Sequence, residues 1–163
     1  ADPVINIDPS AEELAEIALC TAETARSFDV EPRVAMLSFS NFGSSGHPQA
    51  DKVRQATKIV RDRAPDLMVE GEMQVDLALT PSMLEETYPF AELTGRANVL
   101  IFPDLSSANV AYKLTQCLAG AEAVGPILMG FDKPVHLMPS NSTVEQIVQL
   151  TAVAVVDAQK STG

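Results

Sequence analysis

Residues 41–56 read NFGSSGHPQADKVRQA, with two glycines and two serines directly before a helix-like segment. The backbone N–H groups of residues 43–46 and the positive end of a helix beginning at about Pro48 both favour an anion such as a phosphate. The run is not a Walker loop, because no Gly-Lys-Ser/Thr follows, and it does not fit Gly-x-Gly-x-x-Gly. A flexible turn that only starts a helix therefore explains these residues about as well as a phosphate-binding loop does.

The segment after this loop concentrates positive charge. Five of the 11 basic residues fall in a 12-residue window, namely Lys52, Arg54, Lys58, Arg61 and Arg63. In a chain of formal net charge −11, they would create a local positive field for phosphate oxygens. An ordinary solvated helix face is the alternative, and the sequence leaves both interpretations open.

Carboxylates gather after the third expected strand, at Glu70, Glu72 and Asp76. Paired carboxylates act as acids and bases or hold a metal. No His or Cys lies beside them at the spacing of a metal site, so we expect a site-lining or structural role and no metal. His47 and His136 belong to no Ser/His/Asp motif, and Gly-x-Ser-x-Gly is absent, so nothing supports a nucleophilic hydrolase.

Strand and helix patterns alternate along the chain, which is typical of an α/β fold with a largely parallel sheet. We expect strands at residues 4–7, 34–40, 67–69, 99–102, 123–129 and 134–138, and helices at about 11–28, 48–63, 81–86, 107–118 and 143–159. Ser10 with Glu13 and Ser142 with Glu145 have the spacing of capping boxes. Ligands of open α/β sheets bind beyond the carboxyl ends of the strands, where loops 41–47, 71–76, 103–109 and 139–142 lie.

The bulk composition limits the possible classes of protein. A chain of 163 residues with 46% hydrophobic and 20% charged residues is typical of one globular domain. The net charge of −11 argues against binding to nucleic acid or to an anionic membrane. Neither a membrane span nor a signal peptide is visible, and Cys20 and Cys117 are expected to be reduced thiols of a cytoplasmic protein. The start without Met, at Ala1, predicts a fragment of a longer chain.

Four segments together resemble the phosphate acetyltransferase (phosphotransacetylase) family: AMLSFSNFGSS, APDLMVEGEMQVD, RANVLIFPDLSSANVAYKL and GAEAVGPILMGFDKPV. Members of that family move an acetyl group between phosphate and coenzyme A. The resemblance implies a three-layer α/β/α sandwich with a mostly parallel sheet, isocitrate/isopropylmalate-dehydrogenase-like, with the ligand in a cleft between two lobes. Residues of about 1–133 would form one lobe, and a strand and helix at about 134–159 would belong to the other.

The segments NFGSSGHPQADKVRQA, YPFAEL and PVHLMPSNSTVEQIVQLTAVAVVDAQ resemble the C-terminal phosphotransacetylase-like domain of bacterial multi-domain NADP-dependent malic enzymes. Transferases of the family carry a Ser-Arg pair after KPV and an Asp at the start of the last helix. Pro139, Ser140 and Gln146 occupy these positions here. Proline offers no hydroxyl, serine offers no guanidinium to stabilise negative charge, and glutamine cannot act as a general base. The resemblance thus implies a pocket that binds acetyl-CoA without transferring its acetyl group.

This resemblance also implies partners. Acetyl-CoA or CoA would be the effector ligand of this domain, whereas NADP and a divalent metal would belong to a malic-enzyme catalytic domain of the same chain, which converts malate to pyruvate. A homo-oligomer is expected. The expected ligand contacts are Asn41, Gly43, Ser44, Ser45, Gly46, Asn109, Lys113, Met138, Ser140 and Asn141. The alternatives are an active phosphate acetyltransferase and a module that serves only for oligomerisation.

Overall fold

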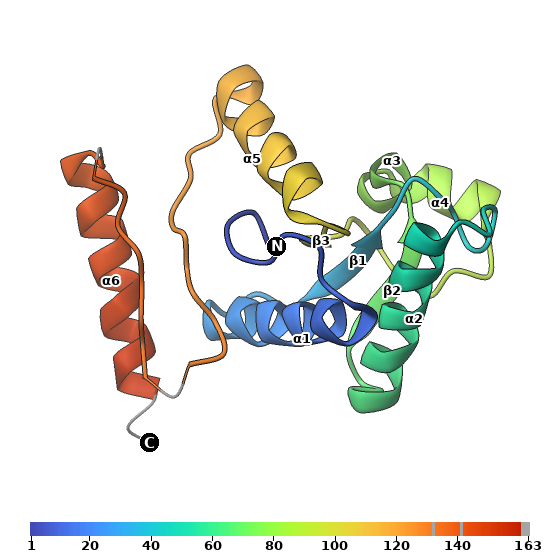
Figure 1. Cartoon of the computed structure of the whole chain (residues 1–163), viewed down its shortest axis with the longest axis horizontal. Coiled ribbons are helices and arrows are strands. Elements are labelled where there is room, and N and C mark those ends of the chain that lie inside the picture. Colours follow the sequence, from blue (N-terminus) through green and yellow to red (C-terminus); the bar gives the residue numbers. More distant parts are fainter. Residues whose placement is uncertain (132, 141, 161–163) are drawn as a thin grey trace. The chain divides into compact units, whose positions relative to one another are not determined.

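The computed structural model describes residues 1–131, 133–140 and 142–160 (Figure 1). Contacts divide the chain into two compact units, Ala1–Tyr112 and Lys113–Gly163. The elements in chain order are α1 (Ala11–Ser27), β1 (Arg33–Leu37), α2 (Pro48–Arg63), β2 (Met68–Met73), α3 (Val75–Leu79), α4 (Pro81–Thr87), β3 (Val99–Ile101), α5 (Leu105–Ala119) and α6 (Val144–Lys160). The predicted lobe boundary near residue 133 concerns a longer protein and stays a prediction.

The first unit is built on a parallel three-stranded sheet in the order β2-β1-β3. The connection from β1 to β2 contains α2, and the connection from β2 to β3 contains α3 and α4. Along β1, Met36 lies opposite Gly71 but Leu37 lies opposite Met73, so the register shifts by one residue. Glu72 is the extra residue of β2 at this irregularity, which has the form of a β-bulge.

Helices cover both faces of this sheet, as Figure 1 shows. Val34 and Met36 of β1 pack with buried residues of α1 and α2, whereas Ala35 and Leu37 pack with those of α3 and α4. Successive strand residues point to opposite faces, so one buried strand supplies both cores. The predicted α/β fold with a parallel sheet and flanking helices is confirmed.

The starts of the first two long helices are as predicted. Glu13 donates its N–H to Ser10 Oγ at 3.2 Å and Ser10 donates its N–H to Glu13 Oε2 at 2.8 Å, which completes the capping box of α1. α2 begins at Pro48, where a missing N–H costs nothing, and His47 Nδ1 accepts the Gln49 N–H at 3.2 Å. The loop before α2 therefore ends at a fixed helix start.

Several predicted strand boundaries in the first unit are wrong. Residues 4–7 form no strand, because the Asp2 carboxylate accepts the N–H groups of Val4, Ile5 and Asn6 and ties the segment into a local turn. β1 ends at Leu37 instead of residue 40, and β2 runs on from residue 69 to Met73. The short helix α3, which follows β2, was not predicted.

The second unit contains no regular strand in its described residues. The strands predicted at 123–129 and 134–138 are wrong, since the described residues of these segments form only an isolated antiparallel bridge, between Ile127 and His136. Pro126 and Pro134 have no N–H to donate, and Gly125 and Gly130 adopt positive φ angles of 139° and 80°. The chain is extended here, but these residues interrupt any longer ladder.

The last helix forms as predicted, but its capping box lies one residue later. Thr143 donates its N–H to Gln146 Oε1 at 3.0 Å, and Gln146 donates its N–H to Thr143 Oγ1 at 3.2 Å. Ser142, which we had predicted as the cap with Glu145, instead donates its hydroxyl to the Pro139 carbonyl at 2.7 Å. Among the described helices, none is both long and apolar enough to cross a membrane.

Candidate functional site

A pocket of about 340 Å³ lies in the first unit at the carboxyl ends of β1 and β3. Ser38 and Phe39 follow β1, Pro103 and Asp104 follow β3, and the wall is completed by Asp8 and Gln49. This is the edge of a parallel sheet at which α/β proteins bind their ligands. The pocket is therefore the candidate site of this unit.

The lining of the pocket favours groups that donate hydrogen bonds. Asp8 Oδ1 accepts from Lys52 Nζ at 2.7 Å, and Asp104 Oδ1 accepts the Ser107 N–H at 2.8 Å at the start of α5. Carboxylates accept hydroxyl and amide donors and repel phosphates. With the exposed ring of Phe39 as an apolar wall, the pocket suits a neutral, partly apolar part of a ligand.

The serine loop, defined as residues 38–47, lies beside this pocket, and most of its N–H groups donate within the loop or to Glu72. Its backbone N–H groups donate as follows: Ser40 to Ser38 Oγ, Asn41 to Ser44 Oγ, Phe42 to the Glu72 carbonyl, Gly43 to Glu72 Oε1, Ser44 to the Asn41 carbonyl, Ser45 to Ser40 Oγ and His47 to Ser45 Oγ. Within the loop, Phe39 and Gly46 are the residues whose N–H has no partner in the described chain, and they are not adjacent. The loop thus lacks the row of free donors that a phosphate cradle requires.

Glu72 is the centre of this network. Its side chain is 0% exposed, and its carboxylate accepts from Ser40 Oγ at 2.8 Å, from the Gly43 N–H at 2.8 Å and from Arg54 Nε at 3.0 Å. Burial by itself raises the pKa of this carboxyl, but the hydrogen bonds from Arg54, Gly43 and Ser40 outweigh it and hold the pKa below its ordinary value. Glu72 is therefore a buried carboxylate that stays ionised at neutral pH.

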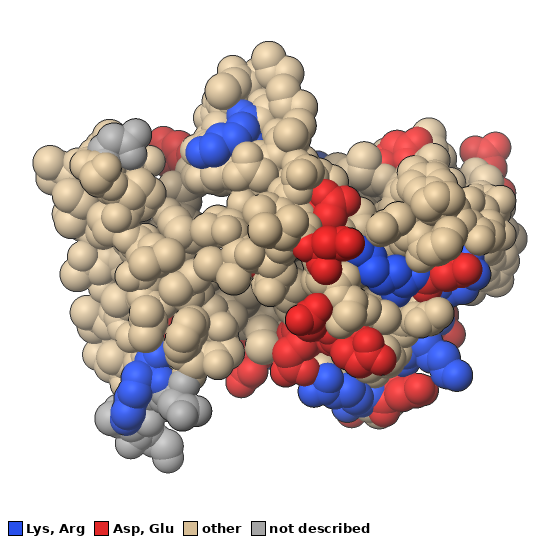
Figure 2. All heavy atoms as spheres, in the orientation of Figure 1, with Lys and Arg blue, Asp and Glu red and all other residues tan. Residues whose placement is uncertain are grey.

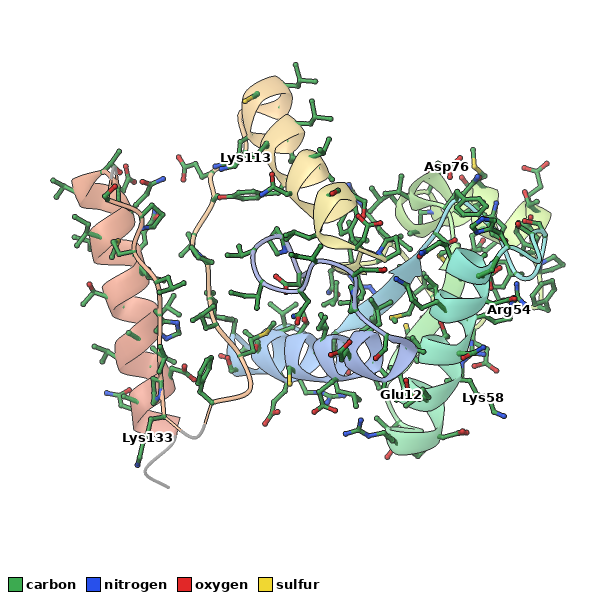
Figure 3. The ribbon with its side chains drawn as sticks, viewed as in Figure 1. Glu12, Arg54, Lys58, Asp76, Lys113 and Lys133 are labelled. Atoms are coloured by element: carbon green, nitrogen blue, oxygen red, sulfur yellow. The ribbon has the colours of Figure 1, made fainter. Side chains whose placement is uncertain are left out.

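Most of the positive charge on α2 is neutralised by pairing. The ion pairs are Lys52 with Asp8, Arg54 with Glu72 and Asp51, Arg61 with Glu70, and Arg63 with Glu16. Lys58 is exposed and has no ion-pair partner among the described residues; Figure 3 shows it on α2 with Arg54. Basic and acidic side chains accordingly lie side by side over this part of the surface in Figure 2. Of the two interpretations left open, the structure favours an ordinary helix face over a phosphate-attracting field.

The second buried acid of β2 also has a structural role. Glu70 accepts a short hydrogen bond from Arg61 Nη2, and its other oxygen accepts the Glu92 N–H at 2.7 Å. Asp76 lies on α3 and accepts the N–H of Leu77 at 3.0 Å. No group of three His, Cys, Asp or Glu residues able to hold a metal occurs in the described part of the chain. The expected structural role of Glu70 and Glu72 agrees with these contacts.

The remaining predicted ligand contacts are spread over both units. In the first unit, Asn41 Nδ2 donates to Gln74 Oε1 at 3.0 Å, and Asn109 Nδ2 donates to the Pro3 carbonyl at 3.1 Å. Of the predicted contacts in the second unit, Lys113, Met138 and Ser140 are exposed, as is Pro139. Gln146 is half-buried in the capping box of α6. Asn141 lies outside the described residues. As ligand contacts, all of these stay predictions.

The Arg54–Glu72 and Arg61–Glu70 pairs were missed by the sequence analysis. A signal for them exists, because residues seven apart share a face of a helix and residues two apart share a face of a strand. In the sequence, the two arginines have the first spacing and the two glutamates have the second, although the bulge at Glu72 departs from the alternation of a regular strand. Adjacent elements with these spacings predict a doubly paired contact.

Comparison with known proteins gives closely similar relatives. The phosphate acetyl/butaryl transferase family matches residues 1–155. The NADP-dependent malic enzyme of Escherichia coli (strain K12) is 48% identical over 160 residues, which make up 98% of this chain and 21% of that protein. The phosphate acetyltransferase of Bacillus subtilis (strain 168) is 45% identical over 158 residues, 97% of this chain and 49% of that protein. The crystal structure of a phosphotransacetylase from Streptococcus pyogenes is similar with a TM-score of 0.91 and 48% identity. The alignment covers 99% of this chain and 48% of the Streptococcus pyogenes chain.

The coverage of these relatives is uneven. The chain spans about half the length of the Bacillus subtilis phosphate acetyltransferase and of the Streptococcus pyogenes phosphotransacetylase, and about a fifth of the Escherichia coli malic enzyme. Such coverage is that expected of a phosphotransacetylase-like domain within a longer protein. The match of one family over almost the whole sequence, and a shared fold at high identity, lead to one assignment. The chain belongs to the phosphate acetyl/butaryl transferase family.

Proposed function

We propose that this chain is an acetyl-CoA-binding regulatory domain of an NADP-dependent malic enzyme and that it does not itself transfer acetyl groups. The observation that carries the proposal is the set Pro139, Ser140 and Gln146 at the positions where the resemblance implies catalytic residues. Pro139 and Ser142 form a local turn, and Gln146 caps α6 with Thr143. The Pro139 carbonyl and the Gln146 side chain are thus used to shape the chain.

The missing chemistry follows from the side chains themselves. A general base must accept a proton near neutral pH, and the Gln146 amide does not do so. Without a guanidinium at residue 140, negative charge that develops on the thioester oxygen or the phosphate has no charge-assisted partner from this position. Acetyl-CoA would be bound and left intact.

The pocket beside the serine loop would take a neutral part of the ligand. Ser38 and Gln49 supply polar groups, Phe39 supplies an apolar wall, and the Gly46 N–H is free to donate. Lys113 and the other contacts expected from the sequence in the second unit are proposed separately from this pocket. The phosphates of CoA are not assigned to the closed part of the serine loop.

Regulation requires a difference in affinity between two states of the whole enzyme. NADP and the divalent metal would act in the malic-enzyme catalytic domain. Acetyl-CoA, bound at a separate site, would change the balance between the two states of the enzyme. A cytoplasmic homo-oligomer completes the proposal. Its subunits would meet in part through apolar side chains of α6, since Val144 and Val148 are 78% and 63% exposed in the single chain.

The second candidate is an active phosphate acetyltransferase. It is favoured by the identity of 45% to the Bacillus subtilis enzyme of that name over 97% of this chain. A third role, oligomerisation alone, rests on the same exposed face of α6. Both alternatives predict outcomes different from those of the regulatory proposal.

The deciding experiment uses the longer protein that carries this chain. We expect no acetyl-CoA formation from acetyl phosphate and CoA above the uncatalysed rate, together with a change in malate oxidation when acetyl-CoA is added. Turnover at the rate of a genuine transferase would overturn the regulatory proposal in favour of the second candidate. If the protein does not bind acetyl-CoA at all, the third candidate, a role in oligomerisation alone, would remain.

A pair of lysine variants tests the location of the ligand. Lys113→Ala should weaken acetyl-CoA binding, because the proposal places that ammonium group against the ligand. Lys58→Ala removes another exposed lysine, on α2, and should leave binding unchanged. Isothermal titration calorimetry on both variants measures the difference, and equal affinities would remove Lys113 from the site.

A further inference from the structure

The serine loop surrounds an anion that belongs to the protein. The carboxylate of Glu72 accepts from the Ser40 hydroxyl, the Gly43 N–H and the guanidinium of Arg54. A hydroxyl, a loop N–H and a guanidinium are the donors with which proteins hold phosphate oxygens. Here all three converge on an internal carboxylate with no exposed surface.

The irregularity of β2 brings Glu72 to this position. Met36 and Leu37 pair with Gly71 and Met73, so Glu72 is left out of the regular register. Its carbonyl accepts the Phe42 N–H at 2.8 Å while its carboxylate accepts the Gly43 N–H at 2.8 Å. Backbone and side chain of one residue therefore hold two successive residues of the loop.

Arg54 completes the enclosure from α2. Its Nη2 donates to the Ser45 carbonyl at 3.0 Å, and Nε and Nη2 both contact the Glu72 carboxylate. The Ser40 hydroxyl accepts the Ser45 N–H at 3.0 Å and so joins the two ends of the loop around the same carboxylate. An external phosphate at this point would meet a buried negative charge and would find its donors in use.

We propose that Glu72 is the internal anion of the serine loop: it positions the loop and excludes external phosphate groups from it. This goes beyond acetyl-CoA binding, because it concerns the loop itself and holds for any phosphorylated ligand. The loop then acts as a fixed wall beside the pocket at Ser38 and Phe39. The phosphates of a bound ligand lie elsewhere.

The first test needs no variant. The protein, labelled with ¹⁵N, is titrated with inorganic phosphate at constant ionic strength while the amide signals of Gly43 and Ser45 are followed. We expect no saturable shift at either amide. A saturable shift at both would show phosphate in the loop and would overturn the proposal.

The second test removes the carboxylate. In Glu72→Ala the Gly43 amide should exchange with solvent at least about tenfold faster, which corresponds to about 1.4 kcal/mol of lost local stability. Acetate has the size of the group removed, so it should restore protection at Gly43 in this variant, whereas chloride should not. Unchanged exchange at Gly43 in a folded Glu72→Ala protein would overturn the proposal.

Two further variants separate loop positioning from general destabilisation. Glu70→Ala breaks the neighbouring ion pair with Arg61 and should leave exchange at Gly43 within about twofold of the wild type after correction for global stability. Glu72→Gln keeps the size of the side chain and should speed exchange at Gly43 without rescue by acetate. An equal effect of Glu70→Ala at Gly43, or no effect of Glu72→Gln, would overturn the proposal.

Discussion

A single buried carboxylate, Glu72, links a strand, a loop and a helix of this protein. Replacing it with glutamine removes the charge but not the volume, and leaves the Arg54 guanidinium without its partner. Because Arg54 is 42% exposed, water compensates it in part. We expect Glu72→Gln to lower the free energy of unfolding by about 1–3 kcal/mol at neutral pH, measured by urea denaturation. A loss below about 0.5 kcal/mol would contradict this.

The same residue predicts a dependence on pH. The pKa of Glu72 is lower in the folded protein than in the unfolded chain, so its contribution is complete above the unfolded value of about 4.3. As the pH falls through the lower folded pKa, the carboxyl takes up a proton and the contribution is lost. The difference in stability between wild type and Glu72→Gln should therefore shrink from pH 6 toward about pH 3. A constant difference would show that the charge is unimportant.

Cys20 provides a second test at the residue scale. Burial raises the pKa of its thiol, and the nearby carboxylates of Glu16 and Glu23 raise it further. Less thiolate forms at a given pH, so iodoacetamide should alkylate Cys20 more slowly in the folded protein than in the urea-unfolded chain. Mass spectrometry of the peptides measures both rates, and equal rates would contradict the prediction.

Single residues were the hardest level to predict from the sequence. For Glu72 only a site-lining or structural role was expected from the sequence. Its pairing was not, because Arg54 lies 18 residues away and meets it through tertiary packing. The acceptors of the loop N–H groups could not be predicted for the same reason. Which donors remain free depends on Glu72, and this residue meets the loop only after β1 and β2 pair.

At the scale of elements, Gly71 controls how closely β2 approaches β1. It has a φ of +149°, and a Cβ added there would lie 2.6 Å from the Met36 carbonyl oxygen. Backbone cannot move aside as a flexible side chain does. We expect Gly71→Ala to lower the free energy of unfolding by about 2–4 kcal/mol, from overpacking and an unfavourable φ. Gly46→Ala is the control, since no atom lies within 4 Å of its added Cβ.

The start of α6 depends on Thr143 and Gln146. Thr143→Ala removes the cap hydroxyl and should weaken the first turn of the helix by about 1 kcal/mol. Amide exchange in that turn reports the loss directly, even if the rest of the chain is unaffected. Ser142→Ala should have a smaller effect in the first turn of α6, because its hydroxyl bonds to the Pro139 carbonyl and not to the helix. The reverse order of effects would restore Ser142 as the cap.

Helices were predicted well because their signals are local. Ser10 with Glu13, and Pro48 at the first turn of α2, define helix starts within four residues of sequence. Strands depend on partners from distant segments. Residues 123–129 are apolar like β3, yet they form no ladder. A strand needs a neighbouring strand to pair with, and the composition of a segment does not predict whether such a partner lies beside it.

At the scale of the whole molecule, the exposed apolar face of α6 predicts self-association. Val148→Glu places a charge on this face and should lower the oligomeric order or weaken the association of the longer protein. Gln55→Glu adds the same charge to an exposed position of α2 and should not change it. Analytical ultracentrifugation compares the two, and an unchanged order in both would place the subunit contact elsewhere.

The bulge at Glu72 has a practical consequence for protein engineering. A designer who transplants residues 38–47 into another scaffold would carry over the serines and glycines but not the carboxylate that holds them, which arrives from β2. The graft would need Gly71, Glu72 and Arg54 as well, in the same register. The smallest portable unit is therefore not the loop but β1, α2 and β2 together.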